Sequence, residues 1–252
     1  MKKLLIAILA ALFACAPALL GACHPVQHTP GEEKLREFQG ERETAEQEEN
    51  SDSRTIKEEN ISRRIWLTFD DGPTDSTTPA VLDILREKNV KATFFVIGRQ
   101  INGREKILRR EADEGHTIGI HTYSHEYKKI YATADSLLKD IALCNEAIRG
   151  VLPDFKTDLY RFPGGSYNVK RELIDAVEKA GFRHYDGNCS AEDAVCPNTP
   201  ASVLYQNVLD SAGEKSKVIL LMHDGVGYKE TIKCLPSVIE YFREKEFAFC
   251  TL

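Results

Sequence analysis

The chain lacks several features that mark common classes of protein. It has no C-x-x-C pair, which argues against a structural zinc site of that kind. The apolar run Leu4–Leu20 is too short and too rich in Ala to span a membrane as a helix. Basic residues are in the minority, with 33 Lys and Arg against 39 Asp and Glu. Because proteins that bind phosphate chains normally carry a basic face, no nucleic acid is expected as a partner.

The N-terminus has the pattern of a secretory signal over residues 1–23. Met1-Lys2-Lys3 gives a basic start before the apolar run, and the run ends in Leu20-Gly21-Ala22-Cys23. This small-residue site resembles that of a lipoprotein, with Cys23 as the lipidated N-terminus that attaches the protein to a membrane. Cleavage between Ala14 and Ala18, which would release a soluble protein, is the alternative. Both place the rest of the chain outside the cytoplasm, and lipidation places it at the cell envelope.

Residues 24–60 are predicted to be a disordered acidic tether. Between Gly31 and Asn60 the chain has 11 acidic and 5 basic residues and almost no apolar side chains, so it cannot bury enough surface to fold. Residues 61–252 carry 26 basic and 28 acidic residues and form the predicted catalytic domain. Their near-neutral balance favours a neutral polymer as the partner.

Five cysteines lie in this domain, so they cannot all pair with one another. An environment outside the cytoplasm permits one or two disulfides, but the sequence does not determine which cysteines pair. The five are Cys144, Cys189, Cys196, Cys234 and Cys250.

Strand-like and helix-like segments alternate through the domain. Seven such units predict a parallel sheet covered by helices, which is either an open doubly wound sheet or a barrel. Polar groups follow five of the strands, and only a barrel brings so many C-terminal strand ends around one mouth. The sequence therefore predicts an α/β fold, a distorted (β/α)7 barrel with its active site at those ends. The predicted strands are 63–69, 92–97, 116–120, 159–162, 182–185, 217–222 and 247–252, and the main helices are 78–88, 103–114, 134–151, 168–180, one from Pro200, and 235–244.

A metal site is predicted from two of these strand ends. His121-Thr122-Tyr123-Ser124-His125 places two imidazoles four residues apart, where a single turn can aim both at one ion. A catalytic zinc site normally has three protein ligands, so a third is needed. The apolar strand that ends in Asp70-Asp71-Gly72-Pro73 supplies carboxylates for it. The alternatives are a solvated histidine pair and a simple turn.

Two further strand ends complete an ordered set of motifs. Arg161-Phe162-Pro163-Gly164-Gly165 follows the fourth strand, and Leu220-Leu221-Met222-His223-Asp224 closes the sixth. The order Thr-Phe-Asp-Asp, His-Thr-x-x-His, Arg-x-Pro-x-Gly and Leu-Met-His resembles the polysaccharide deacetylases, carbohydrate esterase family 4, also called NodB-like. The resemblance covers about residues 63 to 252. It implies metal-dependent removal of an N-acetyl group from an amino-sugar polymer.

The resemblance also implies roles for the residues near the metal. Asp71, His121 and His125 would be the ligands, leaving a position for water whose pKa the metal lowers. Zinc is the expected metal, and cobalt, nickel and iron suit the same ligands. Asp70 matches the general base of the family, and Arg161 would keep it ionised and oriented.

Other positions match the oxyanion donor and the general acid. The backbone N–H of Gly164 would stabilise the oxyanion, and His223 would protonate the leaving amine. One motif departs from the family, because Ser190-Ala191-Glu192-Asp193-Ala194 stands where Asp-x-x-Asp-Trp is usual. Asp193 is the expected partner that orients His223, with Asp224 as the alternative. The missing Trp removes an apolar contact for the substrate.

The expected substrate is an N-acetylated glycan polymer, and the N-acetylglucosamine of peptidoglycan is the first choice. The alternatives within the same chemistry are deacetylation of chitin oligosaccharides and O-acetyl hydrolysis on xylan. A different class of alternative is a catalytically inactive glycan-binding module of the same fold. Glycoside hydrolysis by an aspartate pair is a weaker alternative. The protein is expected to act as a monomer.

Overall fold

The computed structural model describes residues 63–196 and 198–252. The predicted signal, the lipid anchor at Cys23 and the tether lie outside these residues. The description that follows therefore concerns the predicted catalytic domain.

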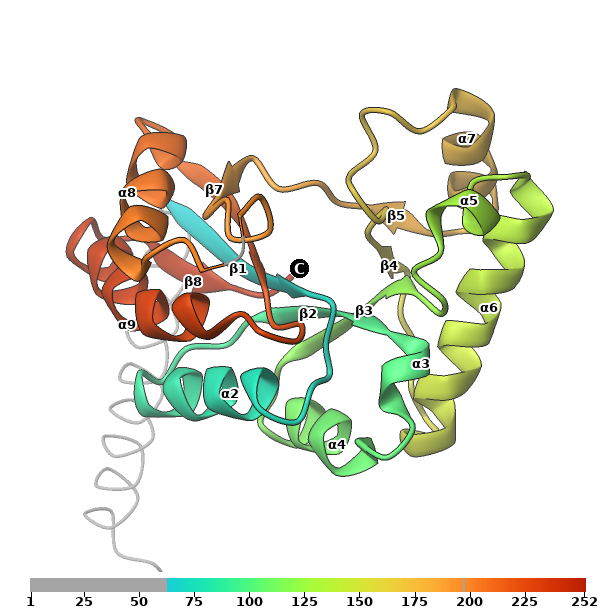
Figure 1. The fold of residues 1–252 in the computed structure, drawn as a ribbon, viewed down its shortest axis with the longest axis horizontal. Helices are drawn as coiled ribbons and strands as arrows, with labels where there is room; N and C mark the ends of the chain where they lie inside the picture. Colours follow the sequence, from blue (N-terminus) through green and yellow to red (C-terminus); the bar gives the residue numbers. More distant parts are fainter. Residues whose placement is uncertain (1–62, 197) are drawn as a thin grey trace, which may run out of the picture. The chain divides into compact units, whose positions relative to one another are not determined.

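A curled parallel sheet forms the centre of the domain, and helices cover its outer side (Figure 1). The strand order is β5-β4-β3-β2-β1-β7-β6, and β8 pairs with β1 beside this path. The predicted distorted barrel is confirmed. It is incompletely closed, since no ladder joins β5 to β6 among the described residues. The strands are β1 (Arg64–Asp70), β2 (Thr93–Ile97), β3 (Thr117–Thr122), β4 (Leu159–Tyr160), β5 (Arg183–His184), β6 (Cys189–Ser190), β7 (Lys217–His223) and β8 (Ala248–Cys250).

The strand count differs from the expected seven in one place. β6 has only two residues and pairs with β7, so it is too short to show a period-two pattern in the sequence. The last strand, β8, does not extend the sheet at its margin. It pairs with Arg64–Trp66 of β1, whereas β2 pairs with Thr68–Asp70 on β1.

The helices follow the predicted pattern with three differences. Two single-turn helices, α3 and α5, were not expected. The predicted helical segment 235–244 is part of a longer helix, α9, which begins at Lys229 and has Pro236 in its interior. The long amphipathic helix α6 has the predicted bounds. The helices are α2 (Thr77–Glu87), α3 (Gly98–Ile101), α4 (Glu105–Asp113), α5 (Tyr127–Ile130), α6 (Ala134–Val151), α7 (Arg171–Lys179), α8 (Ala201–Ala212) and α9 (Lys229–Glu244).

In the described part of the chain, no helix combines the length and the apolar character that crossing a membrane requires.

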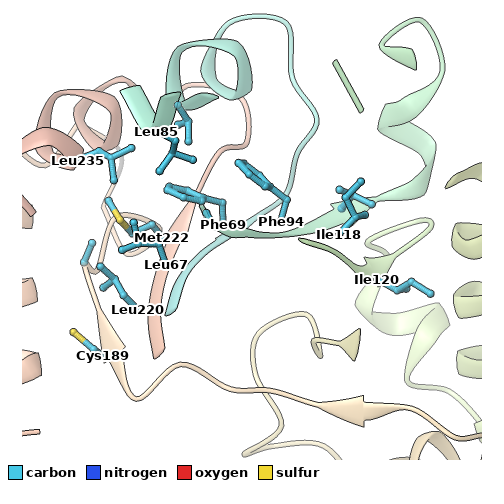
Figure 2. Close-up of a cluster of buried hydrophobic side chains, with 14 of the residues drawn as sticks. Leu67, Phe69, Leu85, Phe94, Ile118, Ile120, Cys189, Leu220, Met222 and Leu235 are labelled. Carbon is cyan, nitrogen blue, oxygen red and sulfur yellow. The ribbon is translucent and has the colours of Figure 1, made fainter. Parts of the chain in front are cut away.

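Alternation along the central strands separates an apolar layer from a polar interior. Leu67 and Phe69 of β1 belong to the hydrophobic cluster, together with Leu85 of α2 and Leu235 of α9 (Figure 2). Thr68 and Asp70, which alternate with these two residues along β1, point to the other side of the sheet, as the period of two requires. Asp70 is the last residue of the strand. The same alternation on β7 buries Val218, Leu220 and Met222 in the cluster.

Four of the five cysteines in the domain do not use the possibility of forming a disulfide. Cys144, Cys189, Cys234 and Cys250 are free thiols, and the first three are buried. Burial raises the pKa of the Cys234 thiol to about 12, which makes it a poor nucleophile at neutral pH. The three buried thiols act as small apolar side chains in the core.

Candidate active site

Three predicted ligands converge at the C-terminal ends of β1 and β3. Oδ1 of Asp71 lies 3.6 Å from Nε2 of His121 and 3.3 Å from Nε2 of His125. One ligand atom from each residue lies within 4.8 Å of the others. The sequence-predicted set is therefore brought together in space, although its members come from segments about fifty residues apart.

The atoms of this set fit a divalent cation. Asp71 Oδ1 is buried and has no hydrogen-bond partner among the described residues. His121 Nδ1 lies 2.9 Å from the carbonyl oxygen of Arg161, which can only accept, so this nitrogen carries the proton and Nε2 is free to bind. Burial, and then the neighbouring His121, lower the pKa of His125 and favour the neutral imidazole that a metal needs.

A β-bulge positions the first histidine. Val96 of β2 pairs with Ile120, but the next residue, Ile97, pairs with Thr122. His121 is therefore the extra residue on β3, and a bulge of this kind redirects a side chain next to a site.

A carboxylate from α6 holds the turn that carries the second histidine. Asp140 Oδ1 accepts from the hydroxyl of Thr122 at 2.5 Å and from the N–H of Tyr123 at 2.6 Å. Its Oδ2 accepts from the N–H of Ser124 at 3.0 Å and from its hydroxyl at 2.6 Å. This turn brings His125 to the site with a left-handed backbone, φ 55°. Asp140 thus positions His125 indirectly, through the three residues of the turn that precede it.

Asp70 is held by a buried arginine, as predicted. Arg161 Nη1 donates to Asp70 Oδ1 at 2.9 Å and to the hydroxyl of Thr68 at 2.7 Å. Arg161 Nε donates to the carbonyl of Tyr185 at 2.8 Å, and its guanidinium lies 4.2 Å from the centre of the Phe95 ring. Both side chains of the ion pair are almost fully buried, so the arginine fixes the orientation of the carboxylate that faces the cavity.

His223 stands beside Asp70, because the two are direct partners in the β1–β7 ladder. Its Nδ1 lies 2.7 Å from Asp193 Oδ1, and its own N–H donates to Asp193 Oδ2 at 2.9 Å. Burial opposes the charged imidazole, but the bond to Asp193 and the charges of Asp193, Asp70 and Asp71 outweigh it and raise the pKa of His223 to about 9. The geometry thus pairs the histidine with Asp193.

The alternative partner, Asp224, is buried in a different place. Its Oδ2 accepts from the hydroxyl of Thr78 at 2.6 Å, and its N–H donates to the carbonyl of Asp70 at 2.9 Å. It also lies against Gly72, where a Cβ would meet Asp224 Oδ2 at 2.2 Å. Asp224 therefore supports the loop after β1 rather than the ring of His223.

Gly164 lies in the same cavity as the predicted ligands and the predicted acid–base pair. Its φ of 77° is in the left-handed region that favours glycine. No hydrogen bond joins its N–H to another described residue, so this donor is available to a bound group. The cavity has a volume of about 410 Å³, and the predicted residues that line it are Asp70, Asp71, His121, His125, Arg161, Gly164, Asp193 and His223.

Three residues of the site were not predicted from the sequence. Tyr228 stacks on the His223 ring with centroids 5.2 Å apart, and Tyr127 meets the His125 ring edge-on at 5.2 Å. The third is Asp140. Only Asp140 could have been found from the sequence, because it is a carboxylate on the apolar face of a helix, between Leu137 and Ile141.

Comparison with known proteins agrees with this geometry. The family model described as polysaccharide deacetylase matches residues 57–185. The putative polysaccharide deacetylase YheN of Bacillus subtilis is 34% identical over 195 residues, which cover 75% of this chain and 67% of YheN. The peptidoglycan-N-acetylglucosamine deacetylase PgdA of Listeria monocytogenes is 32% identical, covering 76% of this chain but 38% of PgdA. The solved structure of a CE4 esterase from Streptococcus mutans superimposes with a TM-score of 0.71 at 30% identity, covering 77% of this chain and 87% of that one. This chain therefore belongs to the polysaccharide deacetylase family.

Proposed function

We propose that the protein removes N-acetyl groups from N-acetylglucosamine in peptidoglycan, with the help of one divalent metal ion. The observation that carries the proposal is the shared cavity. The predicted ligands Asp71, His121 and His125 line it together with a carboxylate fixed by arginine and a histidine paired with Asp193. The Listeria relative is named for this substrate, which supports the choice among acetylated glycans.

The residues suit the hydrolysis of an amide. A metal ion held by Asp71, His121 and His125 would supply Lewis acidity to the water and to the acetyl carbonyl. Asp70 takes a proton from the water as its oxygen bonds to the carbonyl carbon. The N–H of Gly164 donates to the carbonyl oxygen as it becomes negative. His223 gives its proton to the nitrogen as the C–N bond breaks, which leaves acetate and a free amine.

Several finer points belong to the proposal as well. Zinc is the metal that we propose, to be identified by elemental analysis of protein purified without added metal. We propose that residues 1–23 direct export and leave a lipid on Cys23, that residues 24–60 form a tether, and that residues 61–252 act as a monomer at the cell envelope. The tether would let an anchored enzyme reach a polymer around it.

Acetate release from three substrates tests the proposal. Peptidoglycan, chitin oligomers and acetylated xylan are compared with the intact protein, and the Asp70→Asn variant serves as the control. We expect release from peptidoglycan first, loss of activity with a chelator, and no new reducing ends. Faster release from chitin oligomers or xylan would reassign the substrate. Binding to glycan without any release would instead identify an inactive module.

A further inference from the structure

The short helix α5 brings a tyrosine to the cavity of the predicted metal ligands. Tyr127 is its first residue and lies two positions after His125. Its ring meets the His125 ring edge-on, with centroids 5.2 Å apart, and it lines the same cavity as the metal ligands. The tyrosine is 44% exposed, so a bound substrate can reach it.

The ring of Tyr127 also occupies the space beside Gly164. A Cβ on Gly164 would lie 3.0 Å from Tyr127 Cε1 and 3.4 Å from its hydroxyl oxygen. A contact of 3.0 Å is tighter than most Cβ contacts, so a side chain here would push the Tyr127 ring aside by a few tenths of an ångström. The glycine therefore leaves room for a side chain that comes from another element.

A second tyrosine fixes α5 against this loop. The Tyr131 hydroxyl donates to the carbonyl of Pro163 at 2.8 Å, and its ring meets that of Tyr127 with centroids 6.0 Å apart. Tyr127 and Tyr131 are four residues apart, so they lie on one side of the helical turn. The two contacts hold the ring of Tyr127 beside Gly164.

These distances limit how far apart two possible hydrogen-bond donors, the Tyr127 hydroxyl and the Gly164 N–H, can lie. The hydroxyl oxygen of Tyr127 lies 3.4 Å from the Cβ position of Gly164. By covalent geometry, it lies no more than about 6 Å from the Gly164 nitrogen. One oxygen between the two donors can accept from both, because each hydrogen bond spans roughly 3 Å.

We propose that Tyr127 is a further catalytic residue, whose hydroxyl donates, together with the Gly164 N–H, to the carbonyl oxygen of the acetyl group. The inference rests on the proposed function, since it assigns a second donor to the same reaction. A donor at this point acts mainly in the transition state, where the carbonyl oxygen gains negative charge. The ring meanwhile covers the side of the site between His125 and Gly164.

The Tyr127→Phe variant of the intact protein tests the proposal, because it removes the hydroxyl and keeps the ring. We expect kcat to fall at least about tenfold with KM little changed, since a transition-state interaction is lost. Metal content and melting temperature should stay at wild-type values. Tyr205→Phe on α8 is the matched control, because Tyr205 packs edge-on against Tyr241 and does not line the cavity. It should retain full activity.

Three outcomes would overturn the proposal. If Tyr127→Phe retained wild-type kcat while Tyr127→Ala was slow, the ring alone would matter. A rise in KM at constant kcat would mean that the tyrosine binds substrate uniformly instead. A loss of metal from Tyr127→Phe would mean that it supports His125. Wild-type protein without any acetate release would reject the proposed function itself, which is a separate result.

Discussion

Replacing Asp193 by Asn should shift the alkaline limb of the dependence of kcat on pH to lower pH. As the proposed general acid, His223 has to be protonated to release the amine. Burial lowers the pKa of His223, but the bond to Asp193, which contributes most to raising it, and the nearby carboxylate charges together outweigh burial and give the value of about 9. Compared with the ordinary value of 6.5, this pKa corresponds to about 3 kcal/mol in favour of the imidazolium. Asparagine keeps the size of the side chain but loses the charge.

The size of the effect follows from the two protonated fractions. At pH 8, a group with a pKa near 9 is about 90% protonated, and a group with a pKa near 6.5 only about 3%, so kcat should fall roughly 30-fold. A cation on Asp71 cancels the pull of that carboxylate, so the limb of the loaded enzyme lies at or below about 9. The same pairing stabilises the fold fully below pH 6.5, and this contribution is lost as the pH rises through about 9.

The assay is acetate release from pH 5 to 10 under saturating substrate. Asp210→Asn on α8 is the matched control, because Asp210 bonds only to its helical neighbour Gln206 among the described side chains. The reasoning would be refuted if Asp193→Asn left the limb within about half a pH unit of the wild-type limb. In that case another group, such as the stacked Tyr228, would set the proton affinity of His223.

Three other predictions concern the carboxylates and the loop after β1. Asp70→Asn should keep its metal while turnover falls roughly 10²- to 10⁴-fold, whereas Asp71→Asn should bind metal at least about tenfold more weakly. Elemental analysis and acetate release check both variants. The opposite pattern would exchange the roles of the two aspartates. Gly72→Ala should cost about 1–3 kcal/mol in the free energy of unfolding, because its Cβ meets buried Asp224 at 2.2 Å, and an unchanged denaturation midpoint would contradict this contact. Glu111 is fully buried with both carboxylate oxygens unpaired among the described residues, and burial raises its pKa well above 4.5. Stability should therefore fall as the pH rises above 4.5, and Glu111→Gln should flatten this slope in urea titrations between pH 4 and 8; an equal slope would contradict it.

The residues that the sequence predicted for the site lie together in one cavity because most of them stand at the ends of parallel strands. Asp70 and His223 close β1 and β7, so the topology alone makes them neighbours. The pairing of Asp193 with His223 was predicted through the family resemblance, since the spacing of Ser190–Ala194 does not determine which acid faces the ring. The roles of these residues in catalysis stay predictions.

The features that the sequence did not predict depend on contacts between distant segments. Tyr127 matters because it meets Gly164, and no local pattern on α5 indicates that meeting. β6 is only a two-residue pairing with β7, below the length at which alternation is visible. The sequence predicted helix only for 235–244 of α9, whereas the buried side chains of Thr231 and Cys234 belong to an earlier part that begins at Lys229.

The two histidines of the metal set stand on supports of different stability. His121 belongs to a central strand of the sheet, while His125 is on a turn that Asp140 ties to α6. Core strands generally open only when a protein unfolds globally, whereas turns can open locally. A swing of this turn would withdraw one ligand and leave the other two in place. The lifetime of the bound ion would then depend on how fast the turn opens rather than on how fast the protein unfolds. The hydrogen bonds to Asp140 would slow this opening.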